Sequence, residues 1–271
     1  QQDALAQRFL NSYLEITGDY EGLRLLRFYK VYRALVRAKV DALRAGQEQS
    51  GTKEYDRTFK DFIQYVQLAE RYICQAEPCL LINHGLSGSG KSFSTRILLE
   101  KLSAIQIRSD VERKRLFKDS SGSDSHDVIE KGIYTKEATH KTYARLLHIA
   151  KVLLTAGYSV VIDAANLKSQ QRQLFIDLAK ATNKYYFILD YQAPVDILRE
   201  RIKQRAQKGG DVSDATLDVL KHQMSTYEPL SKEEKLFTIE IDTDKDLDVD
   251  SIIEHIHAGD IKSHLSAITC N

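Results

Sequence analysis

The chain has 271 residues, enough for one large domain or for one domain with an appendage. Apolar residues make up 42% and charged residues 28%, as in ordinary globular proteins, and the 13 glycines and 3 prolines exclude collagen-like and low-complexity chains. The 39 basic and 38 acidic residues give a net charge of +1, so no overall field attracts the protein to nucleic acid or to a membrane. The 3 cysteines show no metal-ligand spacing and leave an odd thiol, which favours a cytoplasmic location.

The first third of the chain has the periodicity of helices. Apolar residues recur at spacings of three and four over residues 4–16, 20–45 and 55–75. In the third of these helices, we expect Phe59, Phe62, Val66, Ala69 and Ile73 to point inward. No acid–base constellation lies on the three helices.

Short β-rich runs alternate with helical stretches from residue 78 onward. Strands are expected at residues 79–83, 104–108, 159–163, 185–190 and 237–241, and helices at 91–102, 135–155, 169–180 and 195–208. This alternation predicts an α/β domain whose parallel sheet is covered by helices on both faces, with a domain boundary near Ala76. Ligands bind such sheets at the carboxyl ends of the strands.

Residues 85–92, GLSGSGKS, fit the phosphate-loop pattern G-x-x-x-x-G-K-[ST] in full, between an apolar strand and a helix. In such a loop, successive backbone N–H groups and the helix N-terminus surround a polyphosphate. We expect Lys91 to reach the β- and γ-phosphates and the Ser92 hydroxyl to bind Mg²⁺. The expected nucleotide-binding residues are Gly85, Leu86, Ser87, Gly88, Ser89, Gly90, Lys91, Ser92 and Phe93. The alternative is a glycine-rich turn that binds nothing.

Asp163 ends the third expected strand, at the position where a Walker-B aspartate organises Mg²⁺. The next residue is Ala164, whereas many ATPases have a glutamate there that activates water. This difference favours transfer to a bound hydroxyl over hydrolysis. The alternative is that Asp163 is only a strand-end turn residue.

Asp110 follows the second expected strand, and Arg113 lies three residues further along the chain. A carboxylate at this edge of the sheet can accept the proton of an attacking hydroxyl. Arg113, in the first turn of the next helix, can hold the acceptor or the transferring group. The alternative is that Asp110 caps a helix that begins at Val111, with Arg113 on the surface.

Arg201 and Arg205 are four residues apart and share one face of the helix expected at 195–208. The following Gly209 and Gly210 suit the hinge of a lid whose closure would bring both guanidinium groups onto the γ-phosphate. Periodicity alone favours the alternative, which is a solvated basic face.

Taken together, these motifs resemble the small P-loop kinases related to gluconate kinase, polynucleotide 5′-kinase and the zeta-toxin kinases, over residues 78–234. The matching segments are GLSGSGKS, RSDVERKRL, VVIDAANL, LRERIKQRAQ and HQMSTYEPLSKEE. The resemblance implies a three-layer α/β sandwich with a five-stranded parallel sheet in the order 2-3-1-4-5. It also implies that Asp110 contacts and deprotonates the acceptor hydroxyl, and that Arg201 and Arg205 bind ATP phosphates.

The segments FLNSYLEITGDY and DYEGLRLLRFYKVYRALVRAKVDAL resemble the C-terminal helices of an aminoglycoside-phosphotransferase-like domain. The His-Gly-Asp signature of that domain does not occur here. The resemblance implies that this chain is the C-terminal portion of a fused protein, and that its first helices dock on such a domain without chemistry of their own. We expect residues 1–76 to form this helical segment, 77–258 the P-loop kinase domain and 259–271 a tail.

The sequence thus predicts an ATP- and Mg²⁺-dependent kinase with a hydroxyl acceptor. The segment at 117–134, expected to line the acceptor pocket, lacks the basic–aromatic interleaving that tracks a nucleic-acid strand, which favours a small molecule. A 5′-hydroxyl polynucleotide kinase stays open, because a basic groove beside Asp110 would be lined by Arg108, Arg113, Lys114, Arg115 and Lys118. A nucleotide-binding regulatory module without transfer activity is the third alternative.

Overall fold

The computed structural model describes residues 2–74, 76–118, 135–208 and 216–256. The expected hinge at Gly209 and Gly210, the expected tail at 259–271 and most of the expected acceptor segment at 117–134 lie outside the described residues. Within the described part of the chain, no helix is long and apolar enough to span a bilayer.

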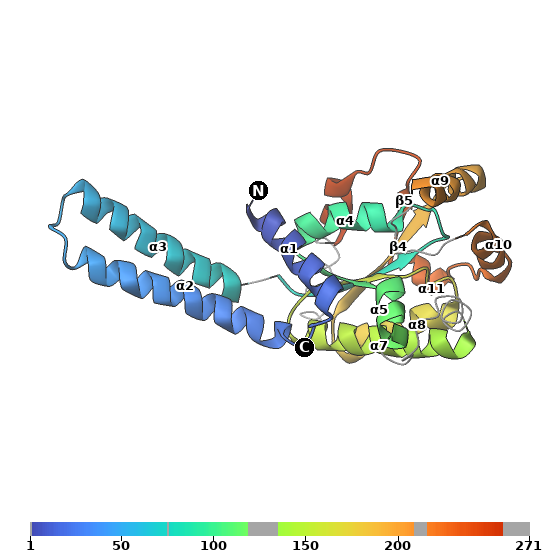
Figure 1. The fold of residues 1–271 in the computed structure, drawn as a ribbon, viewed down its shortest axis with the longest axis horizontal. Helices are drawn as coiled ribbons and strands as arrows, with labels where there is room; N and C mark the ends of the chain where they lie inside the picture. The colour runs from blue at the N-terminus through green and yellow to red at the C-terminus, as the bar shows by residue number, and fades with distance from the viewer. Residues whose placement is uncertain (1, 75, 119–134, 209–215, 257–271) are drawn as a thin grey trace, which may run out of the picture. The chain divides into compact units, whose positions relative to one another are not determined.

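Five parallel strands form one sheet in the order β2-β3-β1-β4-β5 (Figure 1). They are β1 (Cys79–His84), β2 (Ile105–Arg108), β3 (Val160–Asp163), β4 (Tyr185–Gln192) and β5 (Thr238–Asp242). The register places Leu80 of the central β1 beside Val160 on one side and Tyr186 on the other. The expected fold class and strand order are therefore confirmed, and the carboxyl ends of all five strands lie at one edge of the sheet.

Helices cover both faces of the sheet. On one face, α4 (Lys91–Leu102) lies with helical residues 249–256, because Leu98 and Ile252 join the same buried cluster. On the other face, α7 (Lys136–Thr155) packs on β2 and β3, and α8 (Ser169–Ala181) packs on β1 and β4. The helices of the connecting segments include α5 (Ser109–Lys118), α9 (Val195–Lys208), α10 (Leu217–Thr226) and α11 (Lys232–Lys235).

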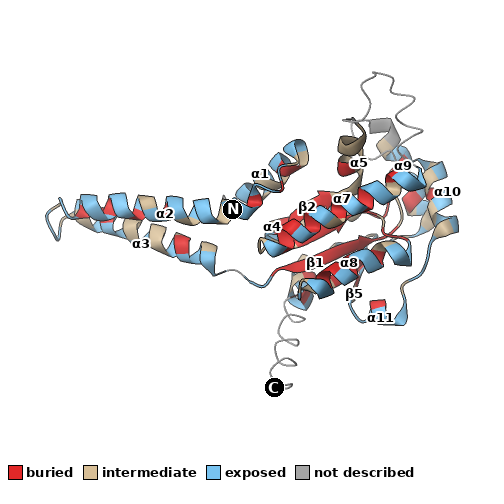
Figure 2. Ribbon diagram, turned by 90° about the horizontal axis from the view of Figure 1, so that it is seen from below, coloured by how far each residue is buried: buried red, intermediate tan, exposed pale blue. Residues whose placement is uncertain are grey.

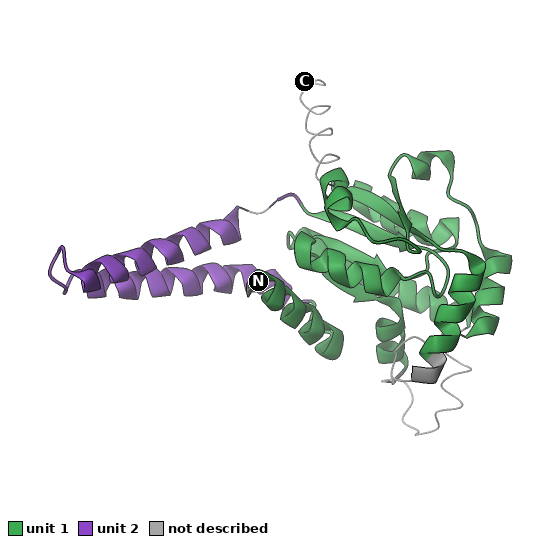
Figure 3. Cartoon of the chain, turned by 90° about the horizontal axis from the view of Figure 1, so that it is seen from above, with its two compact units in different colours: residues 1–20, 78–271 green, residues 21–77 purple. Residues whose placement is uncertain are grey.

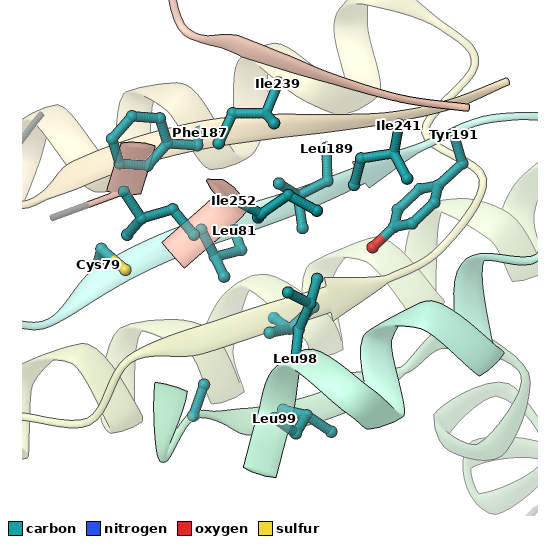
Figure 4. Packing of buried hydrophobic residues seen from close by; sticks show 13 residues of the cluster. Cys79, Leu81, Leu98, Leu99, Phe187, Leu189, Tyr191, Ile239, Ile241 and Ile252 are labelled. Atoms are coloured by element: carbon teal, nitrogen blue, oxygen red, sulfur yellow. The ribbon is translucent and has the colours of Figure 1, made fainter. Parts of the chain in front are cut away.

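The core lies between α4, the sheet and residues 249–256 (Figure 4). Alternate strand residues such as Leu81, Leu189 and Ile241 contribute to it, and all of β1 is buried, as the red strands of Figure 2 show. A strand buried on both faces needs a continuous apolar run, which explains the start of the β1 sequence, CLLI. Each fully buried Leu or Ile contributes about 1.5–3 kcal/mol relative to exposure. The sheet is therefore a rigid base for the loops at its carboxyl edge.

The chain divides into two compact units (Figure 3). The first contains residues 1–20 and 78–271, so that α1 (Gln2–Thr17) belongs with the sheet and packs on α4 and β2. The second, residues 21–77, is a hairpin of α2 (Leu23–Ala45) and α3 (Lys53–Ile73).

Small side chains form the contact between α2 and α3. Ala34 and Ala38 are buried on α2, and Ala69 is buried on α3. Phe59 is 46% exposed and Ile73 is 62% exposed, so the expectation that both point inward is wrong. Alanine faces let two helix axes approach closely, which leaves no room for bulky side chains between them.

Candidate active site

The loop between β1 and α4 has a conformation that requires glycine. Gly88 and Gly90 have φ values of 82° and 83°, in the left-handed region. A Cβ atom at Gly88 would lie 2.8 Å from the Leu198 carbonyl oxygen of α9, which is closer than non-bonded contact allows. The loop is therefore wrapped by backbone that other residues adopt only at a cost, and α9 packs directly on it.

The N-terminus of α4 faces this loop. Its N-cap is Gly90, and no side chain in the described residues caps it, so its first-turn N–H groups can bind an anion. At the loop, Ser89 is buried, and the Ser87 N–H donates to Gln223 Oε1 of α10 at 2.8 Å. Phe93 is 71% exposed. The expected nucleotide-binding residues thus lie around a helix N-terminus, with Phe93 directed to solvent.

Lys91 is folded over the loop. Its Nζ donates to the carbonyl oxygens of Gly85 and Leu86, both at 2.7 Å. Burial lowers the pKa of Lys91 to about 8, against the attraction of Asp163 and with a smaller lowering by Arg205. Phosphate oxygens carry a full charge and are stronger partners than carbonyl oxygens, so Lys91 is placed to exchange one for the other.

Asp163 ends β3 beside the first turn of α4. Its Oδ2 accepts hydrogen bonds from Ser92 Oγ at 3.0 Å and from Gln106 Nε2 at 2.8 Å. Its Oδ1 accepts from Asn83 Nδ2 at 3.3 Å. Burial raises the pKa of Asp163, and the neighbouring Asp110 raises it further. The structure therefore brings the two expected Mg²⁺ ligands, Ser92 and Asp163, into direct contact.

The oxygen donors of Ser92 and Asp163 fit Mg²⁺. This ion prefers oxygen ligands, and proteins usually hold it by one or two carboxylates together with substrate phosphates. In the described ranges, no group of three or more His, Cys, Asp or Glu side chains could hold a metal by itself. A Mg²⁺ ion at this position would thus need further ligands from the phosphates of a nucleotide.

Asp110 is the second residue of α5, so it does not precede the helix as the capping alternative requires. Its Oδ2 accepts from Arg108 Nη2 at 3.1 Å, and its Oδ1 accepts from the Val111 N–H at 3.1 Å. Its charge contributes to the pKa shifts of both Lys91 and Asp163. The carboxylate therefore lies within electrostatic reach of the phosphate loop.

Arg113 lies one turn after Asp110 and is half-buried. Burial raises the pKa of Tyr143 in α7, and the charge of Arg113 lowers it in part. Arg113 thus lies within reach of α7 and is not a fully exposed side chain.

The structure gives the two arginines of α9 different surroundings. Arg201 donates from Nη1 to Thr243 Oγ1 at 2.9 Å and from Nη2 to the Thr243 carbonyl oxygen at 2.7 Å. Its Nη1 also lies 3.5 Å from the Gly88 carbonyl oxygen of the phosphate loop. Arg205 acts on Lys91 through its charge. Arg201 therefore ties α9 to the segment after β5, and Arg205 lies on the side of Lys91.

Several polar residues of the site were not among the residues expected from the sequence. They are Asn83, Gln106, Gln223 and Thr243, whereas Arg108 was expected only as part of a basic groove. Alternation in β2 is a signal for Gln106 and Arg108, because these half-buried residues alternate with the buried Ile105 and Ile107. The register pairs Arg108 with Asp163, so this polar face of β2 adjoins the expected Mg²⁺ site.

Comparison with known proteins finds relatives that are longer than this chain. An uncharacterized protein of Mycobacterium tuberculosis (strain ATCC 25618 / H37Rv) is 32% identical over 215 residues, which cover 79% of this chain and 41% of that protein. An uncharacterized protein of Mycobacterium bovis matches with the same identity and coverage. The chain thus spans about two fifths of the length of the curated relatives it matches.

Two solved structures share the fold. Kti12 of Chaetomium thermophilum in complex with ADP-AlF3 has a TM-score of 0.52 and 17% identity, and the match covers 66% of this chain and 97% of that one. A putative kinase from Chloroflexus aurantiacus has a TM-score of 0.50 and 18% identity, with 72% and 99% covered. A family model described as an AAA domain matches residues 80–230, from the central strand to the segment after α10. Because this match includes more than half of the residues, the chain belongs to that AAA domain family.

Proposed function

We propose that the protein is an ATP- and Mg²⁺-dependent kinase that transfers the γ-phosphate to a hydroxyl group of a small molecule. The observation that supports this most is the position of Asp110. It lies at the carboxyl edge of the sheet, within electrostatic reach of both Lys91 and Asp163. A carboxylate beside a phosphate loop can accept the proton of the attacking hydroxyl.

Each residue has a defined task in this mechanism. The N–H groups of residues 85–92 and the Lys91 ammonium hold the phosphates, and Ser92 and Asp163 hold Mg²⁺. When bound, Mg²⁺ supplies charge neutralisation across the β- and γ-phosphates. Asp110 takes the hydroxyl proton, and Arg113 orients the acceptor.

The arginines of α9 stabilise the charge that develops on the transferring group. Arg205, on the side of Lys91, has this role most directly. Arg201 holds α9 against the phosphate loop through Thr243 and Gly88. Ala164, the residue after Asp163, offers no carboxylate to activate water, which supports transfer over hydrolysis.

Ion pairs beside Asp110 support a small-molecule acceptor. Arg108 is paired with Glu15 and Asp110, and Arg115 is paired with Glu112. These carboxylates neutralise two of the basic residues that would line a polynucleotide groove. A strand with a charged backbone needs uncompensated basic residues along its path.

A transfer screen tests the proposal. The protein, Mg²⁺ and ATP labelled at the γ-phosphate are incubated with sugars, nucleosides and 5′-hydroxyl oligonucleotides. We expect label in a small molecule. Label in the oligonucleotides alone would support the polynucleotide kinase, and ATP binding without transfer to any acceptor would support the regulatory module.

Asp110→Asn tests the role of the base. Asparagine keeps the size of Asp110 and one acceptor oxygen for Arg108, but it loses the ion pair and the bond from the Val111 N–H, so the free energy of unfolding should fall by about 1–2 kcal/mol. Transfer should fall by about 10²- to 10⁴-fold, the usual contribution of a positioned base. Asp196→Asn is the matched control, because Asp196 also lies in the first turn of a helix but is 93% exposed. Transfer by Asp110→Asn at the rate of the control would refute the assignment.

We also propose that the α2–α3 hairpin, which lies in the unit of residues 21–77, docks on a phosphotransferase-like domain. The support is an exposed apolar stripe along α2, formed by Leu25, Phe28, Tyr32 and Leu35. The rings of Phe28 and Tyr32 stack with centroids 6.3 Å apart, so the stripe is pre-ordered. In the longer M. tuberculosis relative, chemical cross-links should form between the equivalent of α2 and the part of that protein that this chain does not cover. The absence of such cross-links would contradict the docking.

A further inference from the structure

The helix α1 packs on β2, the strand at one edge of the sheet. Asn11 Oδ1 accepts from the Gln106 N–H at 2.8 Å, and Asn11 Nδ2 donates to the Ala104 carbonyl oxygen at 3.1 Å. Gln7 Nε2 donates to the same carbonyl oxygen at 2.6 Å. Side-chain amides thus satisfy backbone groups that an edge strand would otherwise present to solvent.

Two arginines hold the C-terminal end of α1. Arg108 Nη1 donates to Glu15 Oε1 at 2.8 Å, and Arg115 Nη2 donates to the Glu15 carbonyl oxygen at 2.6 Å. The other terminal nitrogen of Arg108, Nη2, donates to Asp110 Oδ2. The Arg108 side chain is 14% exposed, whereas those of Glu15 and Asp110 are 38% and 26% exposed, so a largely buried guanidinium bridges two partly solvated carboxylates.

Arg108 engages Asp110 through one hydrogen bond. An arginine beside a carboxylate can form a bidentate pair, which occupies both carboxylate oxygens. Here Nη1 donates to Glu15 and Nη2 donates to Asp110 Oδ2, while Arg108 Nε has no hydrogen-bond partner in the described residues. Arg108 thus holds Asp110 by Oδ2, and within the described residues Asp110 Oδ1 accepts a local bond from the Val111 N–H at 3.1 Å. That oxygen keeps a lone pair for the proton of a hydroxyl.

We infer that Glu15 is a positioning residue for phosphate transfer, which acts through Arg108 to orient the carboxylate of Asp110. This inference rests on the proposed function, in which Asp110 is the base. It makes α1 part of the catalytic unit, although Glu15 lies 65 residues before the matched AAA domain segment at residues 80–230. It also differs from the expectation that the first helices have no chemical role.

Glu15→Gln is the test variant, and Arg8→Gln is its matched control. Arg8 also lies on α1 and also forms an ion pair with the sheet unit, at 2.6 Å to Glu100 of α4, but it has no contact with Arg108. Each variant removes one ion pair between α1 and another element of the sheet unit. Only Glu15→Gln changes the partner of Arg108.

The readouts are transfer of the labelled γ-phosphate from ATP with Mg²⁺ to the acceptor found in the transfer screen, and hydrogen–deuterium exchange at residues 109–113. In Glu15→Gln we expect kcat to fall by about 10- to 10²-fold with an unchanged KM for ATP, the size of effect that a small misplacement of a reacting group produces. Exchange in the first turn of α5 should increase. Arg8→Gln should leave both readouts at the wild-type values.

A double variant identifies the route of the effect. Lysine lacks the planar fork that bridges two carboxylates, so Glu15→Gln should lower kcat no further in an Arg108→Lys background. Equal kcat values of Glu15→Gln and Arg8→Gln would overturn this inference and leave the proposed function standing. The same holds if Glu15→Gln lowers kcat in the Arg108→Lys background by as much as it does in the wild type. A wild-type protein that binds ATP but transfers phosphate to no acceptor would refute the proposed function instead.

Discussion

Replacing Asp163 with asparagine separates the contribution of this residue to the fold from its role in the proposed reaction. The carboxylate is 5% exposed, and burial raises its pKa. Asparagine keeps the size and one oxygen acceptor, but it replaces the second acceptor with an NH2 group that faces Asn83 Nδ2. Asn83 Oδ1 is buried without a hydrogen-bond partner in the described residues, so a flip of the Asn83 amide lets it accept from the new NH2 group.

Two effects determine the change in the free energy of unfolding. The hydrogen bonds from Ser92 and Gln106 no longer reach a charged acceptor, and each loses about 1 kcal/mol. The loss of a buried charge removes a desolvation cost of several kcal/mol, which Arg108 and Lys91 offset in part. We expect a net stabilisation of about 1 kcal/mol, which corresponds to a rise in Tm of about 2–4 °C.

Thermal melting from about pH 4 to pH 8 in the absence of Mg²⁺ measures this effect. The pKa of Asp163 in the folded state lies above the unfolded value of about 3.9. The free energy of unfolding of the wild type is therefore highest, with respect to Asp163, below the unfolded pKa. It decreases as pH rises through the folded pKa, because the buried carboxyl group then becomes charged. The advantage of Asp163→Asn should be absent at the acidic end and should develop toward neutral pH.

Phosphate transfer should fall in the same variant by about 10²-fold or more, since a Mg²⁺ ligand is lost. Asp177→Asn, at an exposed position of α8, is the control and should change neither quantity. A Tm that drops by about 5 °C at neutral pH would show that the charge stabilises the fold. Transfer at the wild-type rate would refute the metal-binding role.

Three further predictions concern other charged groups. The ATP affinity of the wild type, measured by calorimetry, should decrease as pH rises through about 8, where Lys91 loses its charge. The affinity of Lys91→Met should show no such decrease. A wild-type affinity that does not change with pH would contradict the role of the ammonium group. Arg201→Ala should lower both Tm and transfer, because it removes two hydrogen bonds to the segment after β5. Arg205→Ala should lower transfer by up to about 10³-fold, and transfer at the wild-type rate in this variant would contradict its role. Glu234→Gln should lower the free energy of unfolding by about 3 kcal/mol, because it leaves the fully buried Arg172 without its anionic partner at 2.6 Å. Denaturant unfolding measures this change, and a midpoint concentration equal to that of the wild type would refute it.

The sheet and the phosphate loop could be predicted because short-range patterns determine them. A continuous apolar run indicates a strand buried on both faces, and β1 is such a run. The phosphate-loop spacing implies a strand before it and a helix after it, so the position of Lys91 at the start of α4 followed directly. The alternation of strands and helices left few topologies to consider.

The partners of the polar groups could not be predicted in the same way. Arg108 bonds to Glu15, 93 residues earlier in the chain, and Arg201 bonds to Thr243, 42 residues later. Periodicity indicates the face of an element on which a residue lies, but not the element packed against that face. For this reason the sequence suggested equal roles for Arg201 and Arg205, whereas the structure gives them different neighbours.

Lys91 and Asp163 have pKa values that shift in opposite directions for one physical reason. Burial lowers the pKa of Lys91 and raises that of Asp163, so each charged form costs folding free energy that their mutual attraction offsets only in part. Both groups would gain from an opposite charge, which in the proposed function is a phosphate oxygen for Lys91 and Mg²⁺ for Asp163. Such a site would cost the fold free energy that a nucleotide bound with its metal would return, a trade that functional sites commonly make. Arg108 differs from both groups, because its burial acts to lower its pKa but the carboxylates of Asp110 and Glu15 raise it.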